Sequence, residues 1–182
     1  MLLDASNSLI LLIDIQEKLL PKVHGHKELL DFSLKIIDVA KVLNIPMIVS
    51  EQYPKGLGST VKSIKSKLKE SNFKIFEKTT FSCLGNSEIR NYLKQQKRKQ
   101  IIVCGIEAHI CVLQSVNDLL KINNNVFVVD EAVGSRYKES KRIGINRIKQ
   151  IGASLINFEM YLFELIRDSK HHKFKELSSF VK

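Results

Sequence analysis

The segment Ile101-Ile-Val-Cys-Gly105 and the residues that follow it decide the fold of this chain. It is an apolar run of strand length, and apolar residues then recur at helical spacing at Val112, Val116 and Leu119. This pattern is typical of a strand followed by an amphipathic helix. Strands of a parallel sheet read as continuous apolar runs because helices cover both faces of the sheet.

Short apolar runs and helical patterns alternate in the same way along the whole chain. Strands are expected at residues 8–15, 45–50, 73–77, 100–105, 125–130 and 153–157. Helices are expected at residues 29–43, 61–68, 86–96, 111–122, 139–151 and 158–168. Ser59 and Thr60 are the N-cap candidates of the second helix. The alternation predicts an α/β fold, a three-layer α/β/α sandwich with a six-stranded, mainly parallel, Rossmann-like sheet.

The chain has 182 residues, which suits a single domain spanning 1–182. Neither a linker nor a repeat nor a low-complexity tract interrupts the pattern. We expect the last dozen residues either to pack loosely or to drape over the surface.

The basic charge of the chain argues only weakly for a nucleic-acid partner. The net charge is +10, but 23 of the 29 basic residues are Lys and they are scattered over nearly every polar segment. The densest cluster, Lys94–Lys99, lies at the end of an expected helix, where the helix dipole favours cations. Because no aromatic residues for base stacking interleave with it, we predict a solvated surface and no nucleic-acid partner.

Three features predict a cytoplasmic protein without a membrane anchor. The apolar stretch Ser8–Ile13 has no basic lead-in and is closed by Asp14, unlike a signal peptide. Apolar runs stay well short of the roughly 18 residues of a membrane span. The cysteines, Cys83, Cys104 and Cys111, lack the spacing of zinc sites or of a disulfide scaffold, which suits a reducing compartment.

Three chemically useful side chains follow three different strands. Asp14 ends the first strand, Lys78 follows the third, and Cys111 opens the helix after the fourth. Ligands of open α/β sheets bind outside the carboxyl ends of the strands, so the three are expected to converge. A thiol at a helix N-terminus, close to an ammonium, is expected to have a lowered pKa and to act as a nucleophile.

Each residue also has a plain structural interpretation. Cys111 could be a small buried hydrophobe, as Cys104 within its strand is expected to be. Lys78 could be one more exposed lysine, and Asp14 could cap a following helix. His109, two residues before Cys111, is interpreted as structural, because side chains two apart point in different directions.

Four motifs in order resemble the isochorismatase-like hydrolase family. They are Ile13-Asp-Ile-Gln-Glu-Lys18, Ser50-Glu-Gln-Tyr-Pro-Lys-Gly-Leu-Gly58, Lys78-Thr-Thr-Phe-Ser82 and Val103-Cys-Gly-Ile-Glu-Ala-His-Ile-Cys-Val112. The resemblance continues through Val128-Val-Asp-Glu-Ala-Val-Gly-Ser-Arg136 and covers nearly the whole chain. More narrowly, the sequence is similar to isochorismatase domain-containing proteins.

The resemblance implies a catalytic triad of Asp14, Lys78 and Cys111. It also implies a non-proline cis peptide between Ile106 and Glu107, in the turn that would aim backbone N–H groups at an oxyanion. The implied activity is hydrolysis of a small amide or related carbonyl compound through a thioester. Two rival functions remain open, a non-enzymatic interaction protein that kept the fold and a basic nucleic-acid-associated protein.

Residues beside the implied triad are candidates for substrate binding. Gln16, Gln52, Tyr53 and Phe81 follow strands one, two and three at the same edge. Core packing is an equally open interpretation of the two aromatic residues.

The sequence also departs from relatives that use a metal. Nicotinamidases of this superfamily carry an Asp-x-His motif after the second strand, whereas this chain has Ser50-Glu-Gln-Tyr53 there. We therefore predict that the site holds no metal. We also expect no cofactor, a small-molecule substrate and a homo-oligomer.

Overall fold

The computed structural model describes residues 1–69 and 71–181. Six strands form one sheet in the order β3-β2-β1-β4-β5-β6, and each pairing in this described part of the chain is parallel. The predicted six-stranded sheet is confirmed. The strands are β1 (Ser8–Ile13), β2 (Met47–Gln52), β3 (Phe73–Lys78), β4 (Gln100–Ile106), β5 (Asn125–Gly134) and β6 (Ser154–Ile156).

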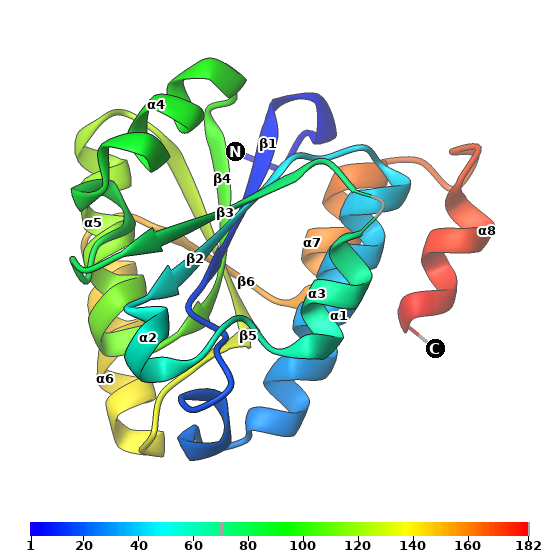
Figure 1. Ribbon diagram of the computed structural model, residues 1–182. Helices are drawn as coiled ribbons and strands as arrows, with labels where there is room; N and C mark the ends of the chain where they lie inside the picture. The colour runs from blue at the N-terminus through cyan, green and yellow to red at the C-terminus, as the bar shows by residue number, and fades with distance from the viewer. Residues whose placement is uncertain (70, 182) are drawn as a thin grey trace.

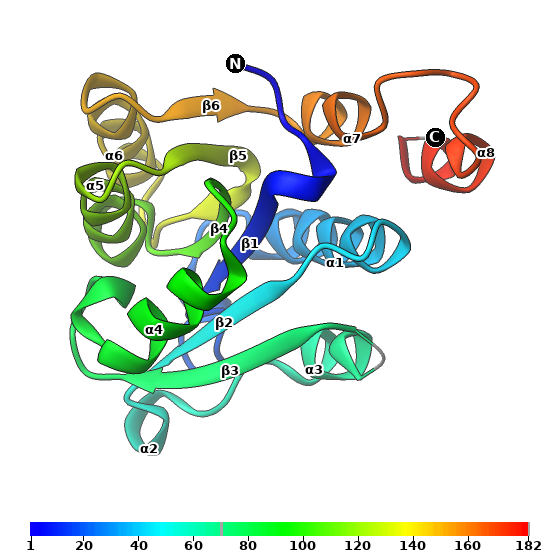
Figure 2. The same ribbon diagram turned by 90° about the horizontal axis from the view of Figure 1, so that it is seen from above.

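Helices cover both faces of the sheet, which gives the predicted three layers (Figure 1). Seen from above, α1, α3 and α7 lie on one side and α4, α5 and α6 on the other (Figure 2). The helices are α1 (His26–Val42), α2 (Pro54–Leu57), α3 (Lys62–Leu68), α4 (Ser87–Gln96), α5 (Leu113–Lys121), α6 (Lys138–Gln150), α7 (Phe158–Ile166) and α8 (Phe174–Leu177).

β1 runs through the centre of the sheet, and all six of its residues are buried. Alternate side chains of a strand point to opposite faces. Ile10 and Leu12 therefore belong to the apolar cluster beneath α1 and α7, whereas Leu9 and Leu11 belong to the cluster beneath α4 and α5. This double burial explains why β1 reads as a continuous apolar run.

The strand order reverses between β1 and β4, so the loops that follow these two strands diverge to opposite sides. A crevice at such a switch point is the usual ligand site of an open α/β sheet. The two strands approach closely at Gly105, whose φ is +122° and where a Cβ would lie 2.1 Å from the carbonyl oxygen of Ile13. Only glycine fits this position.

Several element boundaries differ from the prediction. β5 continues to Gly134, four residues beyond the expected end at 130, with a register shift opposite Val103–Gly105. The N-cap prediction at Ser59 and Thr60 is wrong, because Val61 precedes α3 and makes no side-chain capping bond. The short helix α2 was not expected.

The C-terminal segment is better anchored than expected. Leu177 of α8 is fully buried in the cluster beneath α1 and α7, and Phe174 and Phe180 pack against that cluster. α8 lies on the outer side of α1 and α7 (Figure 2). The segment therefore lies over the surface, which is one of the two expected arrangements, but Leu177 anchors it there. Among the described residues, no helix has both the length and the apolar character required to cross a bilayer.

Candidate active site

Asp14 lies directly after β1 with its side chain fully buried. Its backbone is left-handed, with φ of 52°, a conformation that Asp tolerates better than most residues. One carboxylate oxygen, Oδ1, accepts a hydrogen bond of 2.7 Å from the hydroxyl of Ser50 on β2. The alternative interpretation of Asp14 as a helix N-cap is wrong, because no helix begins at the following residues.

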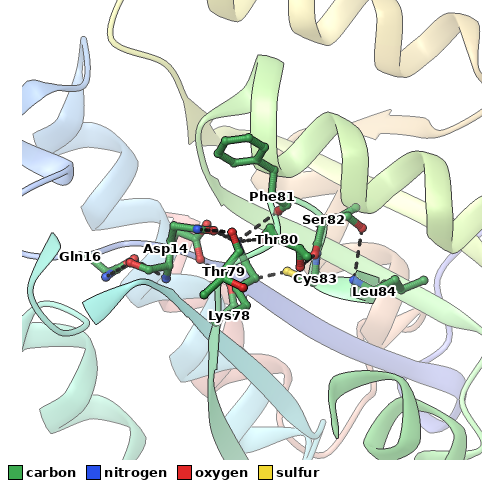
Figure 3. Close-up of polar contacts among 12 residues, drawn as sticks. Asp14, Gln16, Lys78, Thr79, Thr80, Phe81, Ser82, Cys83 and Leu84 are labelled. Atoms are coloured by element: carbon green, nitrogen blue, oxygen red, sulfur yellow. Dashed lines mark hydrogen bonds and ion pairs between the residues drawn. The ribbon is translucent and has the colours of Figure 1, made fainter. Parts of the chain in front are cut away.

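Lys78 ends β3 and points at Asp14 (Figure 3). Its Nζ lies 2.7 Å from Oδ2 of Asp14 and 2.7 Å from Oε1 of Gln52. The carbonyl oxygens of Thr80 and Phe81 accept further hydrogen bonds from the ammonium, at 3.2 and 3.1 Å. The alternative interpretation of Lys78 as an exposed surface lysine is therefore wrong, since its side chain is buried and fully partnered.

Cys111 lies in a helical turn between β4 and α5. The turn, Ala108–Val112, is π-helical, so the helix begins three residues earlier than the predicted 111. The residue is only 6% exposed, and its thiol lies close enough to Asp14 for the carboxylate to raise the thiol pKa. The structure thus brings the side chains of Asp14, Lys78 and Cys111 together from three strand ends.

The charge balance of these groups follows from their burial. Burial raises the pKa of Asp14, although the Lys78 ammonium and the hydroxyl of Ser50 oppose that shift. Burial lowers the pKa of Lys78, but the negative charge of Asp14 together with those of the ionised forms of Cys83 and Cys111 outweighs burial, and the net pKa is raised. The resting pair is an ammonium beside a carboxylate, because each charge is compensated by the other.

The expected lowering of the Cys111 pKa is not found. Burial raises the pKa of this thiol, the negative charge of Asp14 raises it further, and Lys78 lowers it by less. The sequence indicated the helix terminus and the ammonium but not the low exposure of the thiol. Cys111 therefore rests as a thiol.

The turn before Cys111 has the expected cis peptide bond between Ile106 and Glu107. Ile106 is fully buried and Glu107 is 5% exposed. The carbonyl oxygen of Glu107 accepts hydrogen bonds from the N–H groups of Ile110, at 3.0 Å, and Val112, at 3.2 Å. This turn therefore holds the backbone on both sides of Cys111.

Two predicted substrate-binding residues are engaged in the framework of the site. Gln16 is fully buried, and its amide donates to the carbonyls of Gln52 and Gly58 at 3.0 and 2.6 Å. Its oxygen accepts the N–H of Gln52 at 2.7 Å. A side chain used in this way braces the loops after β1 and β2 and does not face a substrate. Gln52 contacts Lys78 and donates to the carbonyl of Thr79 at 2.7 Å.

Both predicted aromatic residues are exposed, Tyr53 at 56% and Phe81 at 55%. Core packing is therefore the wrong interpretation of either. Tyr53 lines a cleft of about 520 Å³ that extends past Lys78 and Thr79 to the start of α4. The ring of Phe81 points away from Asp14 and Lys78 (Figure 3). The cleft is adjacent to the buried charge pair but does not itself include Cys111.

Two further polar residues belong to the site, although the sequence assigned no role to either. Ser50, on β2, pairs in register with Ile13 and so lies beside Asp14. The signal in the sequence that could have identified Ser50 as a site residue is its hydroxyl, which directly follows the apolar residues of β2. Cys83 is fully buried with its Sγ 3.5 Å from the Ser50 hydroxyl, and its N–H donates to Ser115 of α5 at 2.9 Å. Cys83 is close to Lys78 in sequence, but its contacts with Ser50 and Ser115 join segments that only the folded chain brings together.

Candidate metal ligands do not cluster in the part of the chain that the structure describes. Within residues 1–69 and 71–181, no group of three or more His, Cys, Asp or Glu side chains could hold a metal ion. Cys83, Cys104 and Cys111 are all free thiols. Both carboxylate oxygens of Asp14 already accept hydrogen bonds, Oδ1 from Ser50 and Oδ2 from Lys78.

Comparison with known proteins gives consistent similarities. The model of the isochorismatase domain family matches residues 8–160. Isochorismatase family protein 1A of Dictyostelium discoideum is 38% identical over 96% of this chain and 86% of its own length. Isochorismatase domain-containing protein 2 of Danio rerio is 34% identical over 98% and 89%. A structure described as the MAR1 ribonuclease from Caenorhabditis elegans superposes with a TM-score of 0.94 at 39% identity, covering 100% of this chain and 92% of that one.

Proposed function

This chain belongs to the isochorismatase family, and we propose on that premise that it is a cysteine hydrolase of a small amide or related carbonyl compound. The family resemblance of the four motifs and the isochorismatase-like hydrolase fold are confirmed. The observation that carries the proposal is the Asp14 carboxylate, which contacts the Lys78 ammonium at 2.7 Å and acts electrostatically on the nearly buried Cys111 thiol. That arrangement supplies a nucleophile and its base in a site closed to bulk water.

The raised pKa of Cys111 decides how the thiol is activated. Ionisation by loss of a proton to solvent would add a second negative charge beside Asp14, which burial opposes. Transfer of the proton to Asp14 instead moves one negative charge from oxygen to sulfur and leaves the net charge of the site unchanged. Lys78 stays protonated and stabilises the negative charge at either position.

In the proposed reaction, the Cys111 sulfur attacks the substrate carbonyl carbon while Asp14 takes the thiol proton. The carbonyl oxygen becomes an oxyanion, which backbone N–H groups of the turn after Ile106 and Glu107 stabilise. Collapse of this intermediate breaks the C–N bond, and Asp14 gives its proton to the departing nitrogen. An acyl thioester and a free amine or ammonia result.

Water completes the cycle by attacking the thioester. Asp14 accepts a proton from that water and returns it to the departing sulfur, so the carboxylic acid leaves and the thiol is regenerated. Tyr53 lines the cleft beside Lys78, and we propose that it and Phe81 contact the substrate as it enters. Gln52 would hold Lys78 in place.

The experiment is a screen of small amides and carbamoyl compounds for release of ammonia. Parent protein and Cys111→Ala are compared, with Cys104→Ala as a matched control because that thiol is buried in the sheet away from Asp14. The proposal expects turnover by the parent and by Cys104→Ala and none by Cys111→Ala. Equal turnover by Cys111→Ala would overturn it.

A second candidate, hydrolysis of RNA, is favoured by one observation. The 39% identical structure from Caenorhabditis elegans is described as a ribonuclease, and this chain carries a net charge of +10. The cleft is lined by Glu77 and Glu88 as well as by Lys55 and Lys78, and Lys78 is already paired with Asp14, so it offers no net positive charge to a phosphate chain. We therefore propose a small-molecule substrate. Cleavage of a labelled RNA that is abolished in Cys111→Ala would reverse this choice.

We also propose that the chain acts as one domain, in the cytoplasm, and as a homo-oligomer. The three free, buried thiols support a reducing compartment. The exposed side chains of Leu2, Met160 and Phe163 border one surface depression and support self-association. Sedimentation of the parent and of a Met160→Lys, Phe163→Lys variant tests the last point, and a monomeric parent would contradict it.

A further inference from the structure

Two pairs of residues, Glu107 with Arg136 and His109 with Ser135, attach the turn that carries Cys111 to the end of β5. The Glu107 carboxylate accepts the backbone N–H of Arg136 at 2.8 Å and the Nε of Arg136 at 3.1 Å. His109 Nδ1 lies 2.9 Å from the hydroxyl of Ser135. Ser135 and Arg136, which directly follow β5, thus hold His109 and Glu107 of the turn.

Glu107 links these contacts directly to Cys111. Its side chain is 6% exposed and bound to Arg136, while its carbonyl oxygen accepts the N–H groups of the residues on both sides of Cys111. A displacement of Glu107 must therefore displace the backbone of Cys111. The Glu107 carboxylate is thus part of the support of the Cys111 thiol.

The other side of the turn is fixed by α6. A Cβ at Gly144 would lie 2.9 Å from the Cα of His109, so α6 packs directly on the backbone of the turn. The carbonyl oxygen of Ser135 in turn accepts the N–H of His24 at 3.0 Å, which ties the segment after β5 to the loop before α1. The turn therefore cannot shift without breaking contacts with β5 or α6.

Burial of the Glu107 carboxylate costs free energy unless the charge is paired and hydrogen-bonded. Its bidentate contact with a backbone N–H and a guanidinium fixes both position and angle, which apolar packing does less well. Proton transfer from Cys111 to Asp14 requires such accuracy, because the two groups lie on separate strand ends.

We infer that Glu107 and Arg136 are positioning residues that hold the turn of Cys111 in register with Asp14. The inference rests on the proposed function only for its effect on turnover. The contact itself acts on the thiol, so it can be measured by the reactivity of Cys111 whether or not a substrate is known.

The test uses alkylation of Cys111 by iodoacetamide at pH 7, followed by peptide mapping. Arg136→Met removes the Nε donor and keeps the backbone N–H, and Glu107→Gln keeps an acceptor and removes the charge. We expect each variant to lower the labelling rate roughly ten- to hundredfold, the size of effect seen when reacting groups are displaced by about 1 Å. The double variant should be no slower than the slower single variant, because the two residues act through one contact.

Two controls separate positioning from general loss of stability. Arg142→Met breaks the exposed pair that Arg142 forms with Glu139 on α6, and it should leave the labelling rate unchanged. Ile64→Val weakens the buried contact between α3 and α1, far from the turn, and reports the effect of reduced stability alone. Parent-like labelling in Arg136→Met and Glu107→Gln, or equal slowing in Ile64→Val, would overturn the inference.

Substrate turnover distinguishes this inference from the proposed function. With any amide that the parent hydrolyses, we expect kcat to fall in both variants while KM stays within about twofold, because the contact does not face the substrate. If the parent hydrolyses no amide but the labelling rates fall as expected, the proposed function fails and the inference stands. If KM rises and kcat does not fall, the inference fails.

Discussion

The Nζ of Lys78 lies 2.7 Å from Oδ2 of Asp14, and neither side chain is exposed. Lys78 ends β3 and Asp14 directly follows β1, and β2 lies between these two strands, so the contact spans three strands at their carboxyl ends. A buried pair of this kind holds its charges in place but contributes little net stability, because both ions are desolvated. Its value here is to keep a carboxylate ionised beside a thiol.

Removal of one member of this pair should be costly. Lys78→Met leaves the Asp14 carboxylate buried without its cation, which should destabilise the protein by about 3–5 kcal/mol. For a chain of 182 residues this corresponds to a fall in Tm of roughly 6–20 °C. Thermal unfolding measures it. The double variant Lys78→Met, Asp14→Leu should recover part of the loss, and a parent-like Tm in Lys78→Met would show that the pair is not ionised.

The pH dependence of kcat/KM should reflect Asp14 and not a free thiolate. Burial raises the pKa of Asp14 above its ordinary value of 3.8, so activity should fall as the pH falls and the midpoint should lie above 3.8. The pKa of Cys111 is raised above 9.0, so no thiol should ionise near neutrality. Rates from pH 4 to 10 test this. A tenfold rise per pH unit between pH 7 and 9 would indicate a thiolate formed by loss of a proton to solvent.

Cys104 should make the folded protein sensitive to alkali. Burial raises the pKa of this thiol from 9.0 to about 12. Between these values the unfolded chain loses the proton and the folded chain keeps it, so stability should fall by about 1.4 kcal/mol per pH unit. Urea unfolding of Cys104→Ala should show a lower stability at pH 8 but a slope shallower by that amount between pH 9.5 and 11. An unchanged slope would mean that Cys104 ionises normally.

Turnover should not require a divalent metal. The oxygens of Asp14 are occupied by Lys78 and Ser50, and the exit of β2 offers Ser50-Glu-Gln-Tyr53 without a histidine. A hard cation could bind there only weakly. Dialysis against a chelator should leave the rate unchanged. Loss of activity that zinc or iron restores would contradict this prediction.

The sequence predicted the sheet because β1 and β4 are buried on both faces and read as uninterrupted apolar runs. It also predicted that Asp14, Lys78 and Cys111 would meet, since the carboxyl ends of parallel strands share one edge. The positions of Tyr53 and Phe81 beside this edge followed from the same rule. Pattern along the chain was sufficient for these features because each depends on strand order and polarity.

Features that depend on burial and on distant partners could not be predicted in this way. Gln16 has the residue type of a substrate ligand, but the loops around it enclose it completely. The direction of the Cys111 pKa shift depends on how deeply the thiol lies, which periodicity does not report. The contact of Glu107 with Arg136 joins residues 29 apart along the chain and needed the folded end of β5.

The most direct test of the account is to trap the acyl group on the enzyme. An amide identified by ammonia release is mixed with parent protein, the reaction is quenched in acid within one turnover, and the intact mass and the peptide of Cys111 are measured. The account predicts an added mass equal to the acyl group, located on Cys111 and absent in Cys111→Ala. Ammonia release with no adduct on Cys111 in the parent, or with undiminished turnover in Cys111→Ala, would contradict it.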